Sequence, residues 1–152
     1  MLRENIHRDL VQAMKQKDEV RVRTLRLLSS VMKNQEIEQK GRGEDPLLSD
    51  EEVFGIVRRE TKKRKEAAAL YLKGGRPELA AKEEEELKVL ESYLPPELGE
   101  EAVERAVVEA IAAVHPEGIK DFGKVMGAVM KATKGNADAA LVQRIVKERL
   151  RQ

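Results

Sequence analysis

The sequence contains no cysteine and no tryptophan, and aromatic residues make up only 3% of its 152 residues. The absence of cysteine excludes disulfides, thiol catalysis and thiolate metal sites, and it is compatible with a reducing compartment. Scarce aromatics disfavour a β-sheet core. Charged residues, in contrast, make up 38% of the chain and hydrophobic residues 41%. This composition is typical of helices built from Ala, Leu, Glu, Lys and Arg, so we expect an all-α protein.

Long hydrophobic runs are also missing. The N-terminal stretch MLRENIHRDL mixes acids with its apolar residues, so we expect neither a signal peptide nor a membrane span, and we expect a cytoplasmic protein that makes no membrane contact. The formal net charge is only +1, which excludes a uniformly basic nucleic-acid-binding protein and requires any such binding to come from a local patch. Dense charge of both signs indicates a thermophilic source.

Apolar residues recur at helical spacing in the N-terminal part of the chain. One amphipathic segment contains Leu2, Ile6, Leu10 and Met14, and a second ends at the breaker GRGEDP. Ser49 and Glu52 predict a capping box that starts a long third helix, which stops at Gly74-Gly75. Pro77 predicts the first turn of a fourth helix, which ends at Pro95-Pro96.

The double proline is the predicted domain boundary. We predict an N-terminal helical domain of about four helices over residues 1–94, a proline-rich linker over 95–99 and a small three-helix domain over 100–152. Within the last domain, one helix stops at His115-Pro116, a second is capped by Asp121, and a third starts after Gly135-Asn136.

Charge divides unevenly within the C-terminal part. Residues 97–117 contain six acids and one base, a net charge of −5, whereas residues 119–152 contain eight bases and three acids, a net charge of +5. The last two predicted helices therefore form a basic segment that follows an acidic segment in the sequence.

The stretch GKVMGAVMKATKGNAD, residues 123–138, contains two glycines four residues apart in an amphipathic helix. Each glycine costs about 1 kcal/mol relative to alanine, which requires a reason. One interpretation is a neighbouring helix packed on a glycine ridge, and the other is a flat strip on which an RNA backbone lies between lysines. The candidate RNA-binding residues are Lys120, Gly123, Lys124, Gly127, Lys131, Lys134 and Gly135, extended by Arg144, Lys147 and Arg151 of the last helix.

A second basic face lies in RRETKKRKE, residues 58–66. At about 100° per residue, Arg58, Lys62 and Lys65 gather on one side of the helix, flanked by Arg59 and Lys63. A solvated helix face is the plain interpretation, because Lys and Arg are good helix formers. The functional interpretation is a stripe that contacts phosphates, with binding that weakens as salt rises.

Arg64 and Glu60 project instead among apolar residues of the same helix, as Glu83 and Glu86 do on the fourth helix. Charges that face a helix interface are costly unless they are paired. We therefore predict that Arg64 contacts Glu60, with Glu83 or Glu86 as a further partner, in a network that fixes helix register.

No catalytic constellation accompanies these carboxylates. The sequence has no GxxxxGK[ST], HExxH or GxSxG motif, and neither His7 nor His115 has the neighbours of a metal ligand. We expect no metal, no cofactor and no catalytic residue.

Two segments together carry a family resemblance. FGKVMGAVMKATKGNADAALVQRIVKERL resembles the C-terminal tail of GatB, the B subunit of the glutamyl/aspartyl-tRNA amidotransferase. With RRETKKRKEAAALYLKGGRPELAAKEEEELKVLESYLPPEL, the whole chain resembles the stand-alone YqeY proteins of the GatB/YqeY family. The resemblance implies an all-helical N-terminal domain and a small C-terminal domain that binds tRNA in the amidotransferase. It covers Gly123, Lys124, Gly127, Lys131, Lys134 and Gly135.

The family label also implies a carbon-nitrogen ligase that uses glutamine as amide donor. We expect this chain to be too short for the amidase, which resembles a Ser-Ser-Lys enzyme in a separate subunit, and for the domain that amidates aminoacyl-tRNA. Sharing a domain transfers binding more safely than catalysis. Three hypotheses follow: a protein that binds tRNA or another structured RNA near aminoacyl-tRNA synthesis, an accessory of amidotransferase components, and an adapter whose glycine ridge docks a partner helix.

Overall fold

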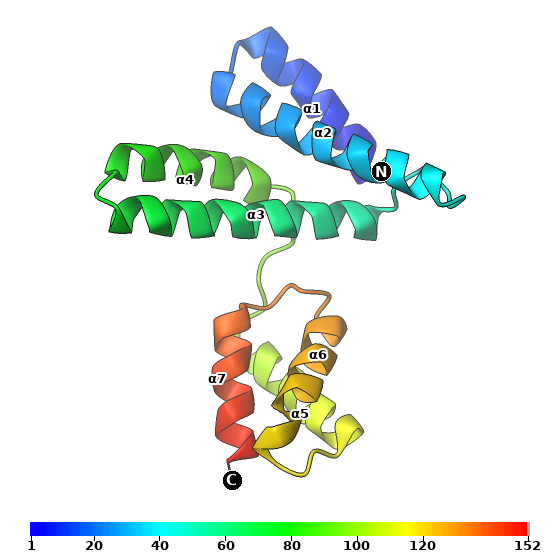
Figure 1. The fold of residues 1–152 in the computed structure, drawn as a ribbon, viewed down its shortest axis with the longest axis vertical. Helices are drawn as coiled ribbons and strands as arrows, with labels where there is room; N and C mark the ends of the chain where they lie inside the picture. The colour runs from blue at the N-terminus through cyan, green and yellow to red at the C-terminus, as the bar shows by residue number, and fades with distance from the viewer. Residues whose placement is uncertain (152) are drawn as a thin grey trace. The chain divides into compact units, whose positions relative to one another are not determined.

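The computed structural model describes residues 1–151, and over that range it contains seven α-helices, one short 3-10 turn and no strand (Figure 1). The predicted all-α class is therefore confirmed. Contacts between Cα atoms group the chain into two compact units, Met1–Leu94 and Pro95–Gln152.

Two helical hairpins make up the unit Met1–Leu94. In the first, α1 (Leu2–Gln16) packs on α2 (Glu19–Gly41), and in the second, α3 (Asp50–Lys73) packs on α4 (Pro77–Glu91) (Figure 1). Each helix is amphipathic, so each pair buries one apolar side and leaves the opposite side to solvent.

Local signals at the helix starts work as the sequence predicts. Ser49 accepts a hydrogen bond from the Glu52 N–H while the Glu52 carboxylate accepts one from the Ser49 N–H, so the capping box is confirmed. Pro77 occupies the first turn of α4, also as predicted. The predicted end of this helix is wrong, because α4 stops at Glu91. The Ser92 hydroxyl donates to the Val89 carbonyl at 2.6 Å, and residues 92–94 form a turn ahead of the prolines.

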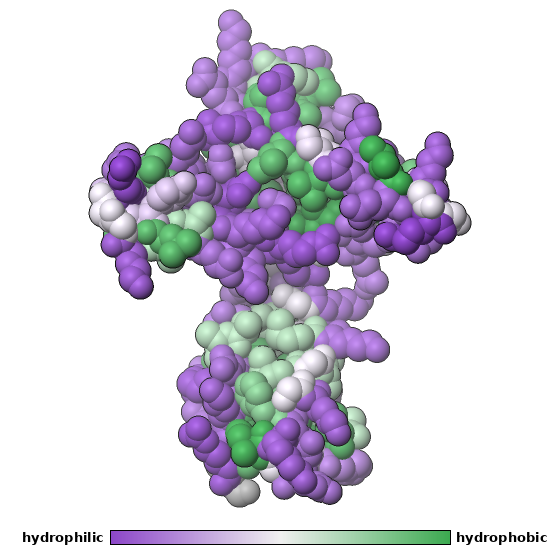
Figure 2. All heavy atoms as spheres, viewed as in Figure 1, coloured by the Kyte–Doolittle hydropathy of each residue, from purple (hydrophilic) through white to green (hydrophobic). Residues whose placement is uncertain are grey.

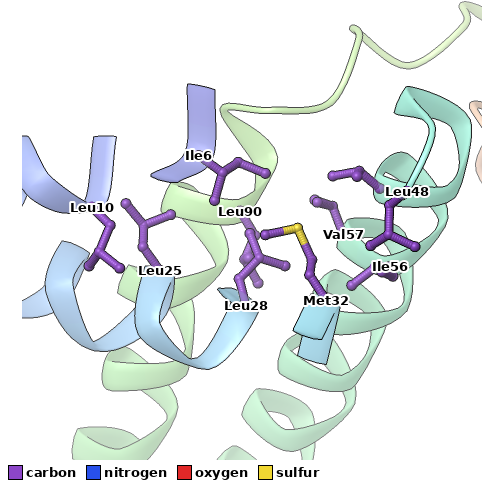
Figure 3. Close-up of a cluster of buried hydrophobic side chains, with 10 residues drawn as sticks. Ile6, Leu10, Leu25, Leu28, Met32, Leu48, Ile56, Val57 and Leu90 are labelled. Atoms are coloured by element: carbon purple, nitrogen blue, oxygen red, sulfur yellow. The ribbon is translucent and has the colours of Figure 1, made fainter. Parts of the chain in front are cut away.

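The core of this unit forms where the two hairpins meet. Ile6 of α1, Leu28 of α2 and Leu90 of α4 converge, each 1% exposed or less (Figure 3). Burying side chains of this size contributes about 1.5–3 kcal/mol each. The remaining members are Leu10, Leu25, Met32, Leu48, Val53, Ile56 and Val57.

Three helices form the unit Pro95–Gln152: α5 (Glu100–Val114), α6 (Phe122–Ala132) and α7 (Ala139–Leu150), with the 3-10 turn η1 (Ile119–Asp121) before α6. Their apolar sides meet in a separate core of mostly β-branched and small residues. Its members are Val103, Val107, Ala110, Val125, Val129, Ala137, Val142, Ile145 and Val146.

Asp121 occupies the N-cap position of α6, as the sequence predicts, but its side chain makes no capping hydrogen bond. Its carboxylate accepts instead from the Glu117 N–H at 2.9 Å, across the loop that precedes η1. That hydrogen bond, followed by the charges of Lys124 and Lys120, lowers the pKa of Asp121.

Candidate functional site

The glycine pair of α6 lies on the solvent side of the helix. Val125 and Val129 are fully buried, whereas Gly123 and Gly127 are exposed. A Cβ atom added to either glycine would meet nothing within 4 Å. No helix of the unit therefore packs on this ridge, and packing inside the unit does not explain the two glycines.

Lysines border the same strip. Lys124 is exposed and lies 3.7 Å from Asp121, one turn earlier. Lys131, one turn after Gly127, is exposed and has no acidic partner within residues 1–151. Lys120 pairs with Glu117 at the surface. We call Gly123, Lys124, Gly127 and Lys131 the α6 strip. In the view of Figure 2, weakly hydrophobic residues, drawn in pale green, gather beside hydrophilic ones on the visible face of the unit that contains α6.

Gly135 has a structural role at the end of α6. Its φ is +72°, a conformation that favours glycine, and its N–H donates to the Met130 carbonyl at 2.9 Å. Lys134, just before it, also has a positive φ of +54°. These two candidate residues therefore terminate the helix, in addition to any contact they make with a ligand.

Asn136 connects the end of α6 to the start of the unit. The sequence did not predict this connection. Its side chain donates to the Pro96 carbonyl at 2.7 Å, and its own carbonyl accepts from the Leu98 N–H at 3.0 Å. The segment that the sequence presents as a linker is thus hydrogen-bonded to the C-terminal unit. The only sequence signal was the Gly-Asn pair, which predicted a turn.

The cations of α7 differ in how far they already interact with other groups of the protein. Arg144 lies 3.0 Å from Glu100 of α5 and 3.3 Å from Glu148, so its charge is largely compensated. The Lys147 ammonium lies 5.6 Å from the centre of the Phe122 ring, which keeps it at the α6–α7 contact. Arg151 is exposed. Of the three, Arg144 is the least available to an external anion.

The basic face of α3 lies in the other unit. Arg58 lies over the Phe54 ring at 5.7 Å, and the Arg59 guanidinium donates to the Gln35 side chain at 3.1 Å. Lys63 pairs with Glu60 at 3.3 Å and Lys65 with Glu91 at 3.8 Å. Lys62 is exposed without an acidic partner within residues 1–151.

Arg64 is a largely buried charge, 14% exposed, with three acidic neighbours. Its guanidinium lies 3.7 Å from Glu60, 3.5 Å from Glu83 and 3.1 Å from Glu86. Arg23 of α2 contacts Glu86 from the other side at 2.7 Å. The structure thus brings together the four residues whose pairing the sequence predicts, and it adds Arg23, whose role the sequence did not reveal. The network ties α2, α3 and α4 to one another.

Neither unit contains an arrangement suited to metal chemistry: within residues 1–151, no three histidine or acidic side chains are placed to hold a metal ion. No helix in that range is both long enough and apolar enough to cross a membrane. The three carboxylates around Arg64 are engaged in ion pairs.

Comparison with known proteins gives a family match over nearly the whole chain. Residues 3–150 match the family described as Yqey-like protein. Altered inheritance of mitochondria protein 41, mitochondrial, from Vanderwaltozyma polyspora is 39% identical over 89 residues, which cover 59% of this chain and 46% of that protein. The protein of the same name from Pyrenophora tritici-repentis is 27% identical over 143 residues, covering 92% and 76%. This chain thus spans about half the length of the first relative.

A shorter match links the chain to the amidotransferase. The B subunit of the aspartyl/glutamyl-tRNA(Asn/Gln) amidotransferase of Corynebacterium diphtheriae is 42% identical over 57 residues, which cover 32% of this chain and 11% of that protein. The resemblance inferred from the sequence is therefore confirmed at the level of the family. The expected cytoplasmic location is contradicted, because both fungal relatives are named as mitochondrial proteins.

Proposed function

The chain belongs to the Yqey-like protein family, and from this premise we propose that its C-terminal unit binds tRNA or another structured RNA without catalysing a reaction itself. One observation carries the proposal: the α6 strip combines two exposed glycines with open Cβ positions and a lysine that has no acidic partner within residues 1–151. We infer that the phosphate backbone of RNA lies along this strip.

The physical argument starts from the cost of the glycines. Gly127 lies in the interior of α6, where glycine destabilises a helix by about 1 kcal/mol relative to alanine, whereas Gly123 lies in the first turn, where this cost is smaller. Neither glycine is compensated by a close contact within its own unit. A bare helix surface lets a polymer backbone approach closely, and flanking lysines attract its phosphates. Phosphate contacts position a nucleic acid without reading its sequence, so the strip suits recognition of shape.

The family link supports RNA as the ligand. The amidotransferase relative is named for an enzyme that acts on tRNA, and this chain shares a segment with it. The shared segment is only 11% of that relative, so we carry over binding and not the ligase reaction. Components of aminoacyl-tRNA synthesis or of the amidotransferase are the protein partners we propose.

We also infer that the two compact units are separate domains, with boundaries at residues 94 and 100 and residues 95–99 between them. Each unit has its own hydrophobic core, which is the property that allows a domain to fold alone. On this inference a fragment comprising residues 95–152 unfolds cooperatively by itself, as circular dichroism during thermal unfolding would test.

The binding test is a titration of folded bulk tRNA against the wild type and the Lys124→Glu/Lys131→Glu variant, at low and near-physiological salt. Lys15→Glu/Lys17→Glu is the matched control, because both lysines are exposed and belong to the other unit. We expect binding in the micromolar range or tighter that weakens with salt, collapses in the α6 variant and persists in the control. No wild-type binding at low salt would overturn the proposal.

A protein adapter is the competing function for the same strip, and one substitution separates the two. Gly127→Leu would fill the bare surface without changing charge. If it abolished capture of a protein partner while the lysine reversals had no effect on that capture or on tRNA, the strip would be a docking site for a helix.

A further inference from the structure

A second surface with the same chemistry lies on α3. Gly55, Arg58 and Lys62 follow one another at intervals of three and four residues, on the side opposite the buried Ile56 and Glu60. A Cβ added to Gly55 would meet nothing within 4 Å. The first half of this long helix therefore presents a bare position ahead of the half-buried Arg58 and the exposed Arg59 and Lys62.

The inward-facing acids near this surface do not cancel its charges. Glu60 points into the protein, where it is 4% exposed and pairs with Arg64 and Lys63. Glu83 and Glu86 are engaged by Arg64, and Glu86 also by Arg23. Glu51 and Glu66 are exposed and fall on the same side of α3 as Gly55 and Lys62 by helical periodicity, so they offset part of the charge there. Arg58, Arg59 and Lys62 outnumber these two acids, so the outer side of α3 keeps an excess of positive charge.

Arg58 gives this surface a further property. Its guanidinium lies 5.7 Å from the centre of the Phe54 ring, so the aromatic ring supports the cation near the surface. A guanidinium plane of this kind can stack on an unpaired base as well as contact a phosphate. Arg59 adjoins it, held by a neutral partner, Gln35, so its charge is retained.

Apolar anchors for a protein partner are few here. Among the described residues, the first half of α3 carries no large, strongly exposed apolar side chain, and the nearest one on α2 is Ile37, two residues after Gln35. Protein interfaces depend on buried aromatic or aliphatic anchors, whereas binding to a phosphate backbone does not. The surface therefore favours a nucleic acid over an acidic protein.

We propose that Arg58, Arg59 and Lys62, the α3 strip, form a second contact site for the RNA backbone, so that both units of the chain engage RNA. This inference rests on the proposed function, because it takes RNA as the ligand of the α6 strip. Two contact sites on one chain raise the overall affinity by making the second contact intramolecular. An RNA large enough to reach both strips is bound more tightly than a short stem of the same composition.

The test measures tRNA affinity of the full chain as a function of salt for Arg58→Gln/Lys62→Gln, with Lys15→Gln/Lys17→Gln as the control of equal charge. Thermal unfolding monitors the fold, and Arg59→Gln/Lys62→Gln keeps the Arg58–Phe54 contact should the first variant unfold. We expect the slope of log affinity against log salt to fall by about 1 for each cation removed. At 0.1 M salt we expect affinity to fall between about 10-fold and 100-fold.

The outcomes separate this inference from the proposed function. If the α3 variants match the control while Lys124→Gln/Lys131→Gln binds weakly, the α3 site is overturned and the α6 site stands. If only the α3 variants bind weakly, the α6 proposal fails and the α3 site stands. If the wild type binds poly-glutamate but no tRNA, and the α3 variants lose that binding, an acidic protein is the partner and both RNA sites are overturned. No tRNA binding at low salt overturns both as well.

Discussion

The hydroxyl of Tyr93 donates a hydrogen bond of 2.6 Å to the carboxylate of Asp9, joining the turn after α4 to α1 across 84 residues of sequence. Arg21 of α2 lies 3.7 Å from the same carboxylate. The first helix of the unit and the turn after its last helix are thus linked by a polar contact, at the edge of the core that Leu90 and Ile6 share.

Removing this hydroxyl should destabilise the unit. We expect Tyr93→Phe to lower the free energy of unfolding by about 1–2 kcal/mol, because a hydrogen bond to a charged group is lost while Asp9 keeps partial access to water. Urea unfolding at neutral pH measures this loss. Tyr71→Phe is the control, since its hydroxyl has no hydrogen-bond partner within residues 1–151.

Because of the same tyrosine, we expect the free energy of unfolding to depend on pH in the alkaline range. Burial, followed by the hydrogen bond to Asp9, raises the pKa of Tyr93. A group whose pKa is raised by folding contributes stability that is complete below its unfolded pKa of about 10 and is lost as pH rises beyond it. Wild-type stability should therefore fall above pH 10 more steeply than that of Tyr93→Phe. Parallel pH curves for the two proteins would contradict this explanation.

Of the substitutions proposed, we expect removal of the Arg64 charge to reduce the free energy of unfolding most. Arg64→Ala would leave Glu60, Glu83 and Glu86 close together and largely buried, with only Lys63 and Arg23 as partners. We expect a loss of about 3 kcal/mol in the free energy of unfolding, measured by urea. Adding Glu60→Ala should restore part of it, because the repulsion falls. Lys62→Ala on the same helix, as control, should change stability by less than about 0.5 kcal/mol.

Because of the capping box of α3, we expect the free energy of unfolding to depend on pH in the acidic range. The Ser49 N–H, followed by the Gln39 side chain, lowers the pKa of Glu52. A lowered pKa contributes stability above the unfolded value of about 4.3, and that stability is lost as pH falls through the folded pKa. Glu52→Ala should cost about 1 kcal/mol at pH 7. The difference in the measured free energy of unfolding between the wild type and Glu52→Ala should shrink as the pH is lowered from 7 to 3. A difference that stays constant would exclude a role for the charge of the Glu52 carboxylate.

The glycines of α6 predict opposite effects on stability and binding. Gly123→Ala and Gly127→Ala should each stabilise the protein by up to about 1 kcal/mol, because the added methyl meets nothing. Both should weaken tRNA binding by covering the strip. Gly135→Ala serves as the contrast, since its φ of +72° makes it destabilising. Thermal unfolding and tRNA titration on the same samples test this, and stabilised variants that bind tRNA unchanged would count against a backbone on the strip.

Local sequence signals predicted much of the fold. Ser49 with Glu52 and Pro77 act within one helical turn, so their effect could be inferred without knowledge of tertiary structure. Asp121 shows the limit of such reasoning, because a carboxylate before a helix can also accept from a loop N–H, and here the Glu117 N–H is the donor. The end of α4 at Glu91 was missed for a similar reason, since the turn at residues 92–94 has no glycine or proline of its own.

The site was predictable where helical periodicity alone decides the direction of a side chain. The glycines of α6 and the inward position of Arg64 follow from that periodicity. Contacts between helices do not follow from it, as the pairing of Arg144 with Glu100 and of Arg23 with Glu86 demonstrates. The hydrogen bonds of Asn136 to Pro96 and Leu98 likewise join segments about 40 residues apart, beyond the reach of any local pattern.

The contrast between the acidic α5 and the basic α6 and α7 affects how fast the C-terminal unit associates with a charged ligand. Residues 97–117 carry a net charge of −5 and residues 119–152 one of +5, so the acids gather on α5 and the bases on α6 and α7 while the two net charges cancel. In the proposed encounter with RNA, such a separation of charge exerts a torque in the field of the polyanion before contact, turning α5 away and the lysines of α6 forward. Productive encounters then become more frequent, and the association rate constant falls as ions shorten the reach of that field.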